Sequence, residues 1–395
     1  MVKKVAIIIE RANITLGGAE RSMFEVARAL SVLGMEVDLL AAKGRSRVRH
    51  IHVLCEDTPG KRVSLARFGE ALRRHFAQHD YDIIHSTLPF AFADLYQPRG
   101  GTYAEAIVRN VASYSSRAVR FWKRTTAFAN RRRTELLRAE RGLCRNFNGP
   151  VVAALSRYVA DQFRQHYATD PERIVLALNG VKINRRVDAT TANRLRTQIL
   201  TELGGAEAEN PVLFLFVAHN FRLKGLDRLI EALRAVEPRQ TERSACLIVV
   251  GGGKSSRYRQ LAKRLGMDKR IIFLGPIRRI QNALSIIDVG ILPTFYDPSS
   301  RFILEALAAG KPVITTRFNG ATDHFTDGRH GRVIDSPDDI QALADAVRHF
   351  TVTANIRRAS EAIVEDRLAE SISIHRVADE LLGVYESIDE RKKRS

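Results

Sequence analysis

The sequence predicts an α/β protein with two Rossmann-like domains that face each other across a ligand cleft. Short apolar, β-branched runs alternate with helical segments along both halves of the chain, as in parallel sheets covered by helices. A length of 395 residues is enough for two domains with complete cores. We expect domains over residues 1–178 and 179–372, an amphipathic helix over 373–388, and a disordered charged tail over 389–395.

The first domain is predicted to begin with a buried strand and a glycine pair. Residues 5–9 form a continuous apolar run, as expected of a strand inside a parallel sheet. Gly17 and Gly18 follow, before an amphipathic helix predicted over 19–33 that ends at Gly34. Glycines at a strand-to-helix turn let a ligand approach the backbone closely, and a plain tight turn explains them equally well.

Two polar residues lie close to later strands of this domain. A strand over 35–41 is followed by one over 81–85, which ends at His85, and Asp94 comes shortly afterwards. Ligands of open α/β sheets bind beyond the carboxyl ends of the strands, so both side chains are candidates for a site. For His85, a packed or capping histidine is an equally good interpretation. Further strands over 150–156 and 174–178 complete the domain.

The segment 117–145 is strongly basic. It holds ten Arg and Lys residues against Glu135 and Glu140, with apolar residues and the only Trp interleaved. A basic amphipathic helix with aromatic residues is typical of a surface that docks on anionic lipid. The residues expected at the membrane are Arg117, Arg120, Trp122, Lys123, Arg124, Arg131, Arg132 and Arg133. A long solvated helix with a core-facing stripe is the main alternative, and nucleic acid is not expected because no recognised binding motif accompanies the charge.

The second domain is predicted to carry basic residues and glycines after its strands. Arg222 and Lys224 follow a strand over 211–216. A strand over 247–253 ends in three glycines, but Ile248 stands where a Walker A loop requires glycine, which excludes that motif. A strand over 271–274 leads to Ile277.

The stretch 297–320 organises this domain. Predicted strands over 289–293 and 312–316 enclose a helix over 302–309, which Gly310 terminates. The amides at the start of that helix favour phosphate. Asp297 and Glu305 flank the turn, and carboxylates accept hydrogen bonds from vicinal hydroxyls, so a sugar nucleotide fits the pair. A solvated acid beside an ordinary helical Glu is the alternative for the pair taken alone.

This stretch resembles the donor-binding motif of the retaining family 4 glycosyltransferases, which have the GT-B fold. The shared pattern is an acid, seven residues, Glu305, and then Ala-x-Ala-x-Gly-x-Pro-Val-Ile over 306–314. The family more often has Glu at the first position, where this chain has Asp297. The loop around Asp94 and the segment 162–181 resemble the lipopolysaccharide core glucosyltransferase I type, and the family resemblance is densest over 81–103, 162–186 and 211–330.

The resemblance implies roles for individual residues. Lys224, Asp297 and Asp94 would be catalytic, Glu305 would bind the donor ribose, and His85 would contact a sugar. The other donor contacts it implies are Gly17, Gly18, Arg185, Arg222, Ile277, Ser300, Arg301 and Phe302. The helix over 373–388 would cross back to the first domain.

The implied activity is a retaining, metal-independent transfer of a hexose from a nucleotide sugar, UDP-glucose above all, to a lipopolysaccharide core or related envelope glycan. No cofactor or metal is expected, and the three cysteines are far apart in the sequence. A net charge of +19 calls for an anionic partner, here the membrane surface, the donor and a glycolipid acceptor. Because no signal peptide or membrane span is evident, we expect a cytoplasmic protein at the inner face of the membrane. A non-catalytic nucleotide-sugar or lipid-surface binding protein, an epimerase and a phosphorylase remain as alternatives.

Overall fold

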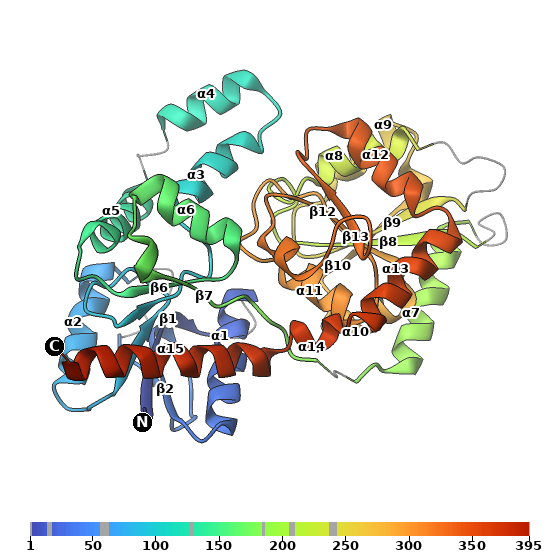
Figure 1. The fold of residues 1–395 in the computed structure, drawn as a ribbon. Coiled ribbons are helices and arrows are strands. Elements are labelled where there is room, and N and C mark those ends of the chain that lie inside the picture. Colours follow the sequence, from blue (N-terminus) through green and yellow to red (C-terminus); the bar gives the residue numbers. More distant parts are fainter. Residues whose placement is uncertain are drawn as a thin grey trace. The chain divides into compact units, whose positions relative to one another are not determined.

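The computed structural model describes residues 2–13, 18–55, 63–126, 130–183, 186–204, 210–236 and 243–394. The chain forms two compact units, each with a parallel sheet and surrounding helices (Figure 1). The first unit comprises residues 1–111, 116–182 and 373–395, and the second comprises residues 112–115 and 183–372. This architecture confirms the predicted fold class of two Rossmann-like domains.

The sheet of the first unit has seven strands in the order β3-β2-β1-β4-β5-β6-β7, and all neighbours are parallel. The strands are β1 (Lys4–Ala12), β2 (Glu36–Gly44), β3 (Ile51–Val53), β4 (Ile83–Ser86), β5 (Leu95–Tyr96), β6 (Val151–Ala154) and β7 (Ile174–Leu176). Residues 5–9 of β1 are all buried, because a central parallel strand is covered on both faces.

Seven helices belong to the described part of this unit, together with a short 3₁₀ turn at Pro171–Arg173. They are α1 (Gly18–Val32), α2 (Leu65–Phe76), α3 (Tyr103–Ala112), α4 (Arg117–Thr125), α5 (Arg131–Arg145), α6 (Arg157–Tyr167) and α15 (Ile374–Arg394). The last helix packs against α1, which places the C-terminal segment of the chain in the first unit (Figure 1).

The sheet of the second unit has six parallel strands in the order β10-β9-β8-β11-β12-β13. The strands are β8 (Val212–Val217), β9 (Ala245–Val250), β10 (Ile271–Gly275), β11 (Val289–Leu292), β12 (Val313–Thr316) and β13 (Gly331–Ile334). The helices are α7 (Ala189–Glu202), α8 (Leu226–Arg234), α9 (Ser256–Arg264), α10 (Ile280–Ile286), α11 (Arg301–Ala308), α12 (Ile340–His349), α13 (Thr353–Glu365) and α14 (Leu368–Ser371). Two 3₁₀ turns lie at Asp268–Arg270 and Gly320–His324.

Two glycines let the elements around the candidate site pack closely. A Cβ atom on Gly290 of β11 would lie 3.0 Å from the Cβ of Ala306, so glycine allows α11 to rest on the sheet. Gly225 has a φ of +75°, and a Cβ there would lie 2.1 Å from the carbonyl oxygen of Pro293. The loop before α8 therefore lies directly against the loop that follows β11.

The structure differs from two of the expectations about helices. Residues 389–394 are not a disordered tail, because α15 continues to Arg394. Lys392 forms an ion pair with Asp94 and donates to the carbonyl of Asp82, and these contacts hold the last turns of the helix. The basic segment 117–145 forms two helices, α4 and α5, instead of one.

Cys55, Cys144 and Cys246 are all buried and form no disulfide. Among the helices of the described residues, none is both long and apolar enough to cross a membrane.

Candidate functional site

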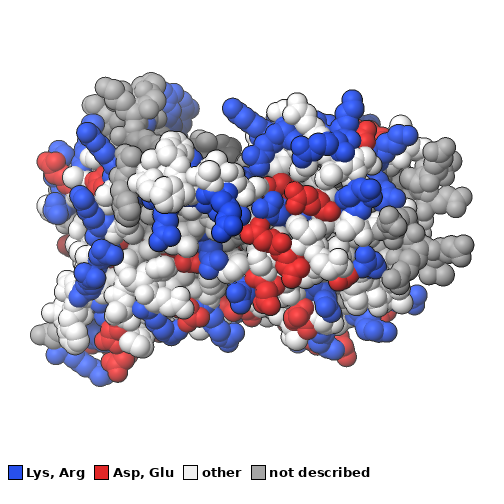
Figure 2. Space-filling view, turned by 90° about the horizontal axis from the view of Figure 1, so that it is seen from above, with Lys and Arg blue, Asp and Glu red and all other residues white. Residues whose placement is uncertain are grey.

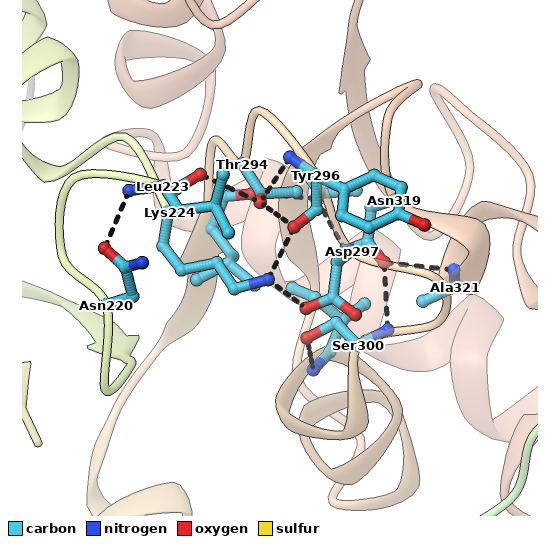
Figure 3. Close-up of polar contacts among 12 residues, drawn as sticks. Asn220, Leu223, Lys224, Thr294, Tyr296, Asp297, Ser300, Asn319 and Ala321 are labelled. Carbon is cyan, nitrogen blue, oxygen red and sulfur yellow. Dashed lines mark hydrogen bonds and ion pairs between the residues drawn. The ribbon is translucent and has the colours of Figure 1, made fainter. Parts of the chain in front are cut away.

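Two loops at the carboxyl edge of the second sheet bring Lys224 and Asp297 together (Figure 3). Lys224 follows β8, and Asp297 follows β11, the strand paired with β8. The Nζ atom of Lys224 lies 2.7 Å from Oδ2 of Asp297 and 2.7 Å from the carbonyl oxygen of Tyr296. Both side chains are mostly buried, at 18% and 16% exposure. An ammonium group has three N–H donors, so these two contacts leave one for a ligand.

Hydrogen bonds within the loops hold the pair in place. The Thr294 hydroxyl accepts from the amide of Tyr296 at 3.0 Å, and the amide of Phe295 donates to the carbonyl of Leu223 at 2.9 Å. The backbone of Asp297 is fixed on both sides, because its amide donates to Phe318 and its carbonyl accepts from Gly320. The pair is therefore positioned by rigid backbone on three neighbouring loops.

Asn319, which follows β12, joins the start of α11 to the next turn (Figure 3). Its Oδ1 accepts from the amides of Ser300 at 3.0 Å and Ala321 at 3.1 Å, and its Nδ2 donates to Thr315. The Ser300 hydroxyl caps α11 by accepting from the amide of Ile303 at 3.4 Å. The Ser300 amide thus donates to Asn319 in this structure, and its contact with phosphate remains a prediction.

Glu305 is held on its own helix. Its Oε1 accepts from Nε of Arg301 at 3.1 Å, and the two side chains are 10% and 13% exposed. The two acids of the sequence motif thus enter separate ion pairs, Asp297 with Lys224 and Glu305 with Arg301. Gly310, with a φ of +70°, follows the end of α11 as predicted for a C-cap glycine.

A cavity of about 350 Å³ lies at the ends of β9 and β10, on the same edge of this sheet. It is lined by Phe221, Val249, Gly251, Gly252, Gly253, Ser255, Arg259, Phe273, Leu274, Gly275 and Pro276. The Arg259 guanidinium lies 4.6 Å from the centre of the Phe273 ring. Glycine is required at Gly251, where a Cβ would come within 1.8 Å of the Ala218 carbonyl. A flat heterocycle fits such a mixture of glycine backbone and aromatic wall.

Two predicted donor contacts of this unit lie beside these groups but are not part of them. Ile277 follows the cavity lining, which ends at Pro276. Arg222 is held by the segment 112–115, because its guanidinium stacks 3.7 Å from the Tyr114 ring centre and donates to the Ser113 hydroxyl. Burial lowers the pKa of Arg222 from its usual value.

In the first unit, the structure contradicts the placement of His85 and Asp94 at a ligand site. His85 is completely buried, and its Nδ1 lies 2.7 Å from the hydroxyl of Tyr385 on α15. Burial lowers the pKa of His85 to about 3, so the ring is neutral. Asp94 precedes β5, at the amino end of the strand, where it accepts from the amide of Ile84 and pairs with Lys392.

Gly18 is the first residue of α1, at the carboxyl edge of the first sheet. Gly17 and Arg185 lie outside the described residues, so their predicted donor contacts remain predictions.

The predicted membrane segment divides into an exposed helix and a docked one. None of the nine residues of α4 is buried, and Phe121 and Trp122 are 72% and 57% exposed. Lys123 lies 4.5 Å from the Trp122 ring centre. On α5, Arg132 pairs with Glu10 and donates to the carbonyl of Val63 at 2.6 Å, so its predicted place at a membrane surface is wrong. Basic side chains outnumber acidic ones on the face of the molecule in Figure 2.

Sequence reasoning missed several residues that build this site. Asn319 and Gly320 form a turn signal after β12, but the sequence does not show that the amide side chain reaches back to α11. The aromatic cavity walls, Phe221 and Phe273, are 52 positions apart and belong to different loops. The three glycines after β9 were excluded as a Walker A loop, and they form the floor of a different cavity.

The fold and this edge of the second sheet define an α/β protein of the class that binds nucleotide-type ligands beyond its strand ends. The profile described as Glycosyltransferase Family 4 matches residues 16–185, and that described as Glycosyl transferases group 1 matches residues 204–359. Together the two profiles cover most of the chain. The chain belongs to these glycosyltransferases and has the GT-B fold.

Individual relatives agree with this assignment. The chain is 24% identical over 346 residues to the lipopolysaccharide glucosyltransferase WaaG of Escherichia coli strain K12, covering 87% of this chain and 88% of the relative. A crystal structure of WaaG superimposes with a TM-score of 0.73 at 21% identity, covering 96% of this chain and 99% of the other. The structure of Anabaena Alr3699/HepE in complex with UDP-glucose gives a TM-score of 0.70 at 18% identity, covering 97% and 99%.

Proposed function

We propose that this glycosyltransferase moves a hexose from a nucleotide sugar, UDP-glucose, to a lipopolysaccharide core or related envelope glycan, with retention of configuration and without a metal. The observation that carries the proposal is the Lys224–Asp297 pair on the same sheet edge as the 350 Å³ cavity. This edge offers a base-sized cavity and an ammonium group for phosphate. The relatives named above, WaaG and a protein crystallised with UDP-glucose, support the choice of donor and acceptor.

Each group on this edge has a chemical task. The cavity would hold the base, and Glu305 would bind the ribose hydroxyls. The third N–H of Lys224 would donate to the pyrophosphate and stabilise the negative charge that grows as it leaves. Asp297 would contact the sugar, and the amides of Arg301 and Phe302 at the first turn of α11 would contact phosphate. No described residue needs to act as a nucleophile, because in a same-face transfer the leaving phosphate oxygen takes the acceptor proton.

The test is the release of UDP when the protein is mixed with UDP-glucose and an envelope lipid extract. We expect release that depends on the extract and is unaffected by a chelator, and a product whose anomeric configuration, measured by NMR, matches that of the donor. UDP binding without release would make the chain a nucleotide-sugar binding protein. An inverted product would exclude the retaining mechanism.

A second part of the proposal is that α4 docks the protein on the anionic inner face of the cytoplasmic membrane. The helix exposes Phe121 and Trp122 next to Arg117 and Arg124, and no residue of α4 is buried. Aromatic side chains enter the headgroup region while each nearby cation contributes about 1 kcal/mol toward anionic lipid.

Cosedimentation with phosphatidylglycerol vesicles at two salt concentrations tests this docking. Phe121→Ser with Trp122→Ser should weaken binding at both salt concentrations, and Arg117→Gln with Arg124→Gln should weaken it mainly at low salt. Circular dichroism checks that each variant folds. The charge control is Arg357→Gln with Arg358→Gln, an exposed pair on α13 of the other unit. If this control lost as much binding as the α4 variants, net charge alone would explain the association.

A further inference from the structure

A second hollow, of about 590 Å³, lies in the first unit at the carboxyl ends of β2 and β3. The described residues of its lining are Gly44, Arg45, Ser46, Arg47 and Val53. Gly44 is the last residue of β2 and pairs with Ala12, the last residue of β1, while Val53 ends β3. The hollow therefore lies on the edge of the sheet where open α/β proteins bind their ligands, as does the start of α1.

The local backbone turns the chain into this hollow. Gly44 has a φ of +131°, and a Cβ there would lie 2.9 Å from the Cβ of Ala12. Glycine is thus required for β2 to end close to β1 and then turn. The Ser46 hydroxyl accepts from the amide of Val48 at 3.1 Å, which closes the turn between Arg45 and Arg47.

Among the residues that the structure describes, the lining of the hollow carries only positive charge. None of the five described lining residues is acidic, and the sequence between Asp38 and Glu56 contains Lys43, Arg45, Arg47 and Arg49 but no Asp or Glu. Arg45 and Arg47 are exposed, and neither forms an ion pair with any other residue that the structure describes. Register pairing sets Arg11 of β1 beside Lys43 of β2, which adds to the positive potential at this edge.

Guanidinium groups bind phosphate through two parallel N–H donors, so two arginines in one hollow, with no ion pair among the described residues, favour a phosphate ligand. The hollow is open to solvent, and its accessible space of about 590 Å³ leaves room for a ligand larger than a lone phosphate. A sugar that carries a phosphate group matches both the size and the charge.

We infer that this hollow binds the phosphate group of a phosphorylated sugar in the acceptor, with Arg45 and Arg47 as the phosphate ligands. The inference rests on the proposed function, because it assigns the acceptor of that reaction to the class of phosphorylated glycans. The donor phosphates have their own ammonium group, Lys224, on the other unit. Arg45 and Arg47 would therefore determine acceptor choice and leave donor binding unchanged.

The direct test is binding of glucose 6-phosphate to the protein saturated with UDP, measured by calorimetry, with glucose as the neutral control. We expect glucose 6-phosphate to bind at least about ten times more tightly than glucose, and Arg45→Gln with Arg47→Gln to remove that difference. The matched control is Arg67→Gln with Arg74→Gln, which removes two exposed charges from α2 of the same unit. Equal binding of the two sugars by the parent protein, or equal loss in the control, would overturn the inference.

Transfer assays then separate this inference from the proposed function. With an envelope glycolipid extract, the Arg45/Arg47 variant should raise the acceptor KM about tenfold or more, and a dephosphorylated extract should show no difference between variant and parent. UDP affinity should be unchanged, and a changed UDP affinity would move the two arginines to the donor side and refute the assignment. Failure of the parent to bind UDP would refute the proposed function while leaving the glucose 6-phosphate result to stand.

Binding to vesicles distinguishes a glycan phosphate from the phosphate of a lipid headgroup. The Arg45/Arg47 variant should bind phosphatidylglycerol vesicles like the parent, because the inferred ligand is a glycan phosphate. Loss of vesicle binding together with unchanged glucose 6-phosphate binding would assign the hollow to lipid headgroups and overturn the inference.

Discussion

Replacing Lys224 by Met is the sharpest test of the proposed donor site, because the structure gives this residue an ion pair and the proposed function gives it a chemical role. Its Nζ contacts Oδ2 of Asp297 and the carbonyl of Tyr296, each at 2.7 Å. Removing one partner of a fully buried ion pair costs roughly 3–5 kcal/mol of stability. The two side chains retain 18% and 16% exposure, so solvent screening should reduce the loss to about 1–2 kcal/mol. For a unit of this size, that lowers Tm by several degrees.

The chemical effect should be much larger than the structural one. A fixed cationic donor to a leaving group acts mainly in the transition state, and removing such a donor lowers kcat by about 10²–10³-fold. We expect kcat for UDP release to fall by this factor in Lys224→Met, at a temperature where circular dichroism shows the variant fully folded. The donor KM should change much less.

Lys392→Met is the matched control, because Lys392 and Asp94 also form a 2.7 Å ion pair, in the other unit. It should lower Tm slightly and leave kcat at the parent value. The double variant Lys224→Met with Asp297→Asn should recover part of the stability lost in Lys224→Met, because Asp297 no longer carries an unpaired charge. A Lys224→Met variant with parental kcat and a raised KM alone would refute the transition-state role.

Three further predictions concern UDP affinity, the stability of the second unit, and the pH dependence of stability. Glu305→Ala should weaken UDP binding about 10–100-fold by calorimetry, since a hydrogen bond to a charged group is worth about 1.5–3 kcal/mol, and unchanged affinity would exclude the ribose contact. Gly225→Ala should destabilise the second unit by at least about 1–2 kcal/mol and lower activity, because the new Cβ would clash with Pro293. Gly328→Ala is the control: its φ of +77° is similar, but the space around it is open, so this substitution should cost only the backbone strain. Burial raises the pKa of Glu140 to about 7, above its unfolded value of 4.5. The folded protein therefore binds the Glu140 proton more tightly than the unfolded chain does, which stabilises the fold at low pH. This stabilisation, roughly 3 kcal/mol, is lost as the pH rises from 4.5 to 7. Denaturation midpoints measured from pH 5 to 8 should therefore fall less in Glu140→Gln than in the parent, and equal slopes would contradict the shift.

Much of the fold was predictable because its signals are local. The run over 212–217 is buried almost throughout, as its unbroken apolar sequence indicates for a central parallel strand. Gly34 and Gly310 have φ values of +89° and +70°, which explains why each follows the end of a helix. Such features depend on a few neighbouring residues, and the sequence displays them directly.

The errors in the first unit arose from contacts between distant residues. His85 forms a hydrogen bond with Tyr385, which lies 300 positions away in the sequence. No residue near His85 in the sequence indicates that α15 packs over it. Asp94 was interpreted as part of a loop after β4. It precedes β5, a strand of only two residues, which no pattern in the sequence reveals. Asp94 also forms the ion pair with Lys392. The unpredicted strand β5 therefore explains both the position of the Asp94 carboxylate and the helical end of α15.

The second unit shows why loop residues were easier to predict than their partners. Lys224 and Asp297 each follow a strongly apolar strand, and parallel neighbouring strands place such loops on one edge. That they form an ion pair could not be predicted across 73 positions, nor that Asp297 is fixed between Phe318 and Gly320. The pairing also gives the shorter Asp297 side chain a physical role. A carboxylate held 2.7 Å from the ammonium compensates its charge, and Nζ uses two of its three N–H donors inside the protein. In the proposed donor complex, the third N–H would donate to phosphate without breaking the pair.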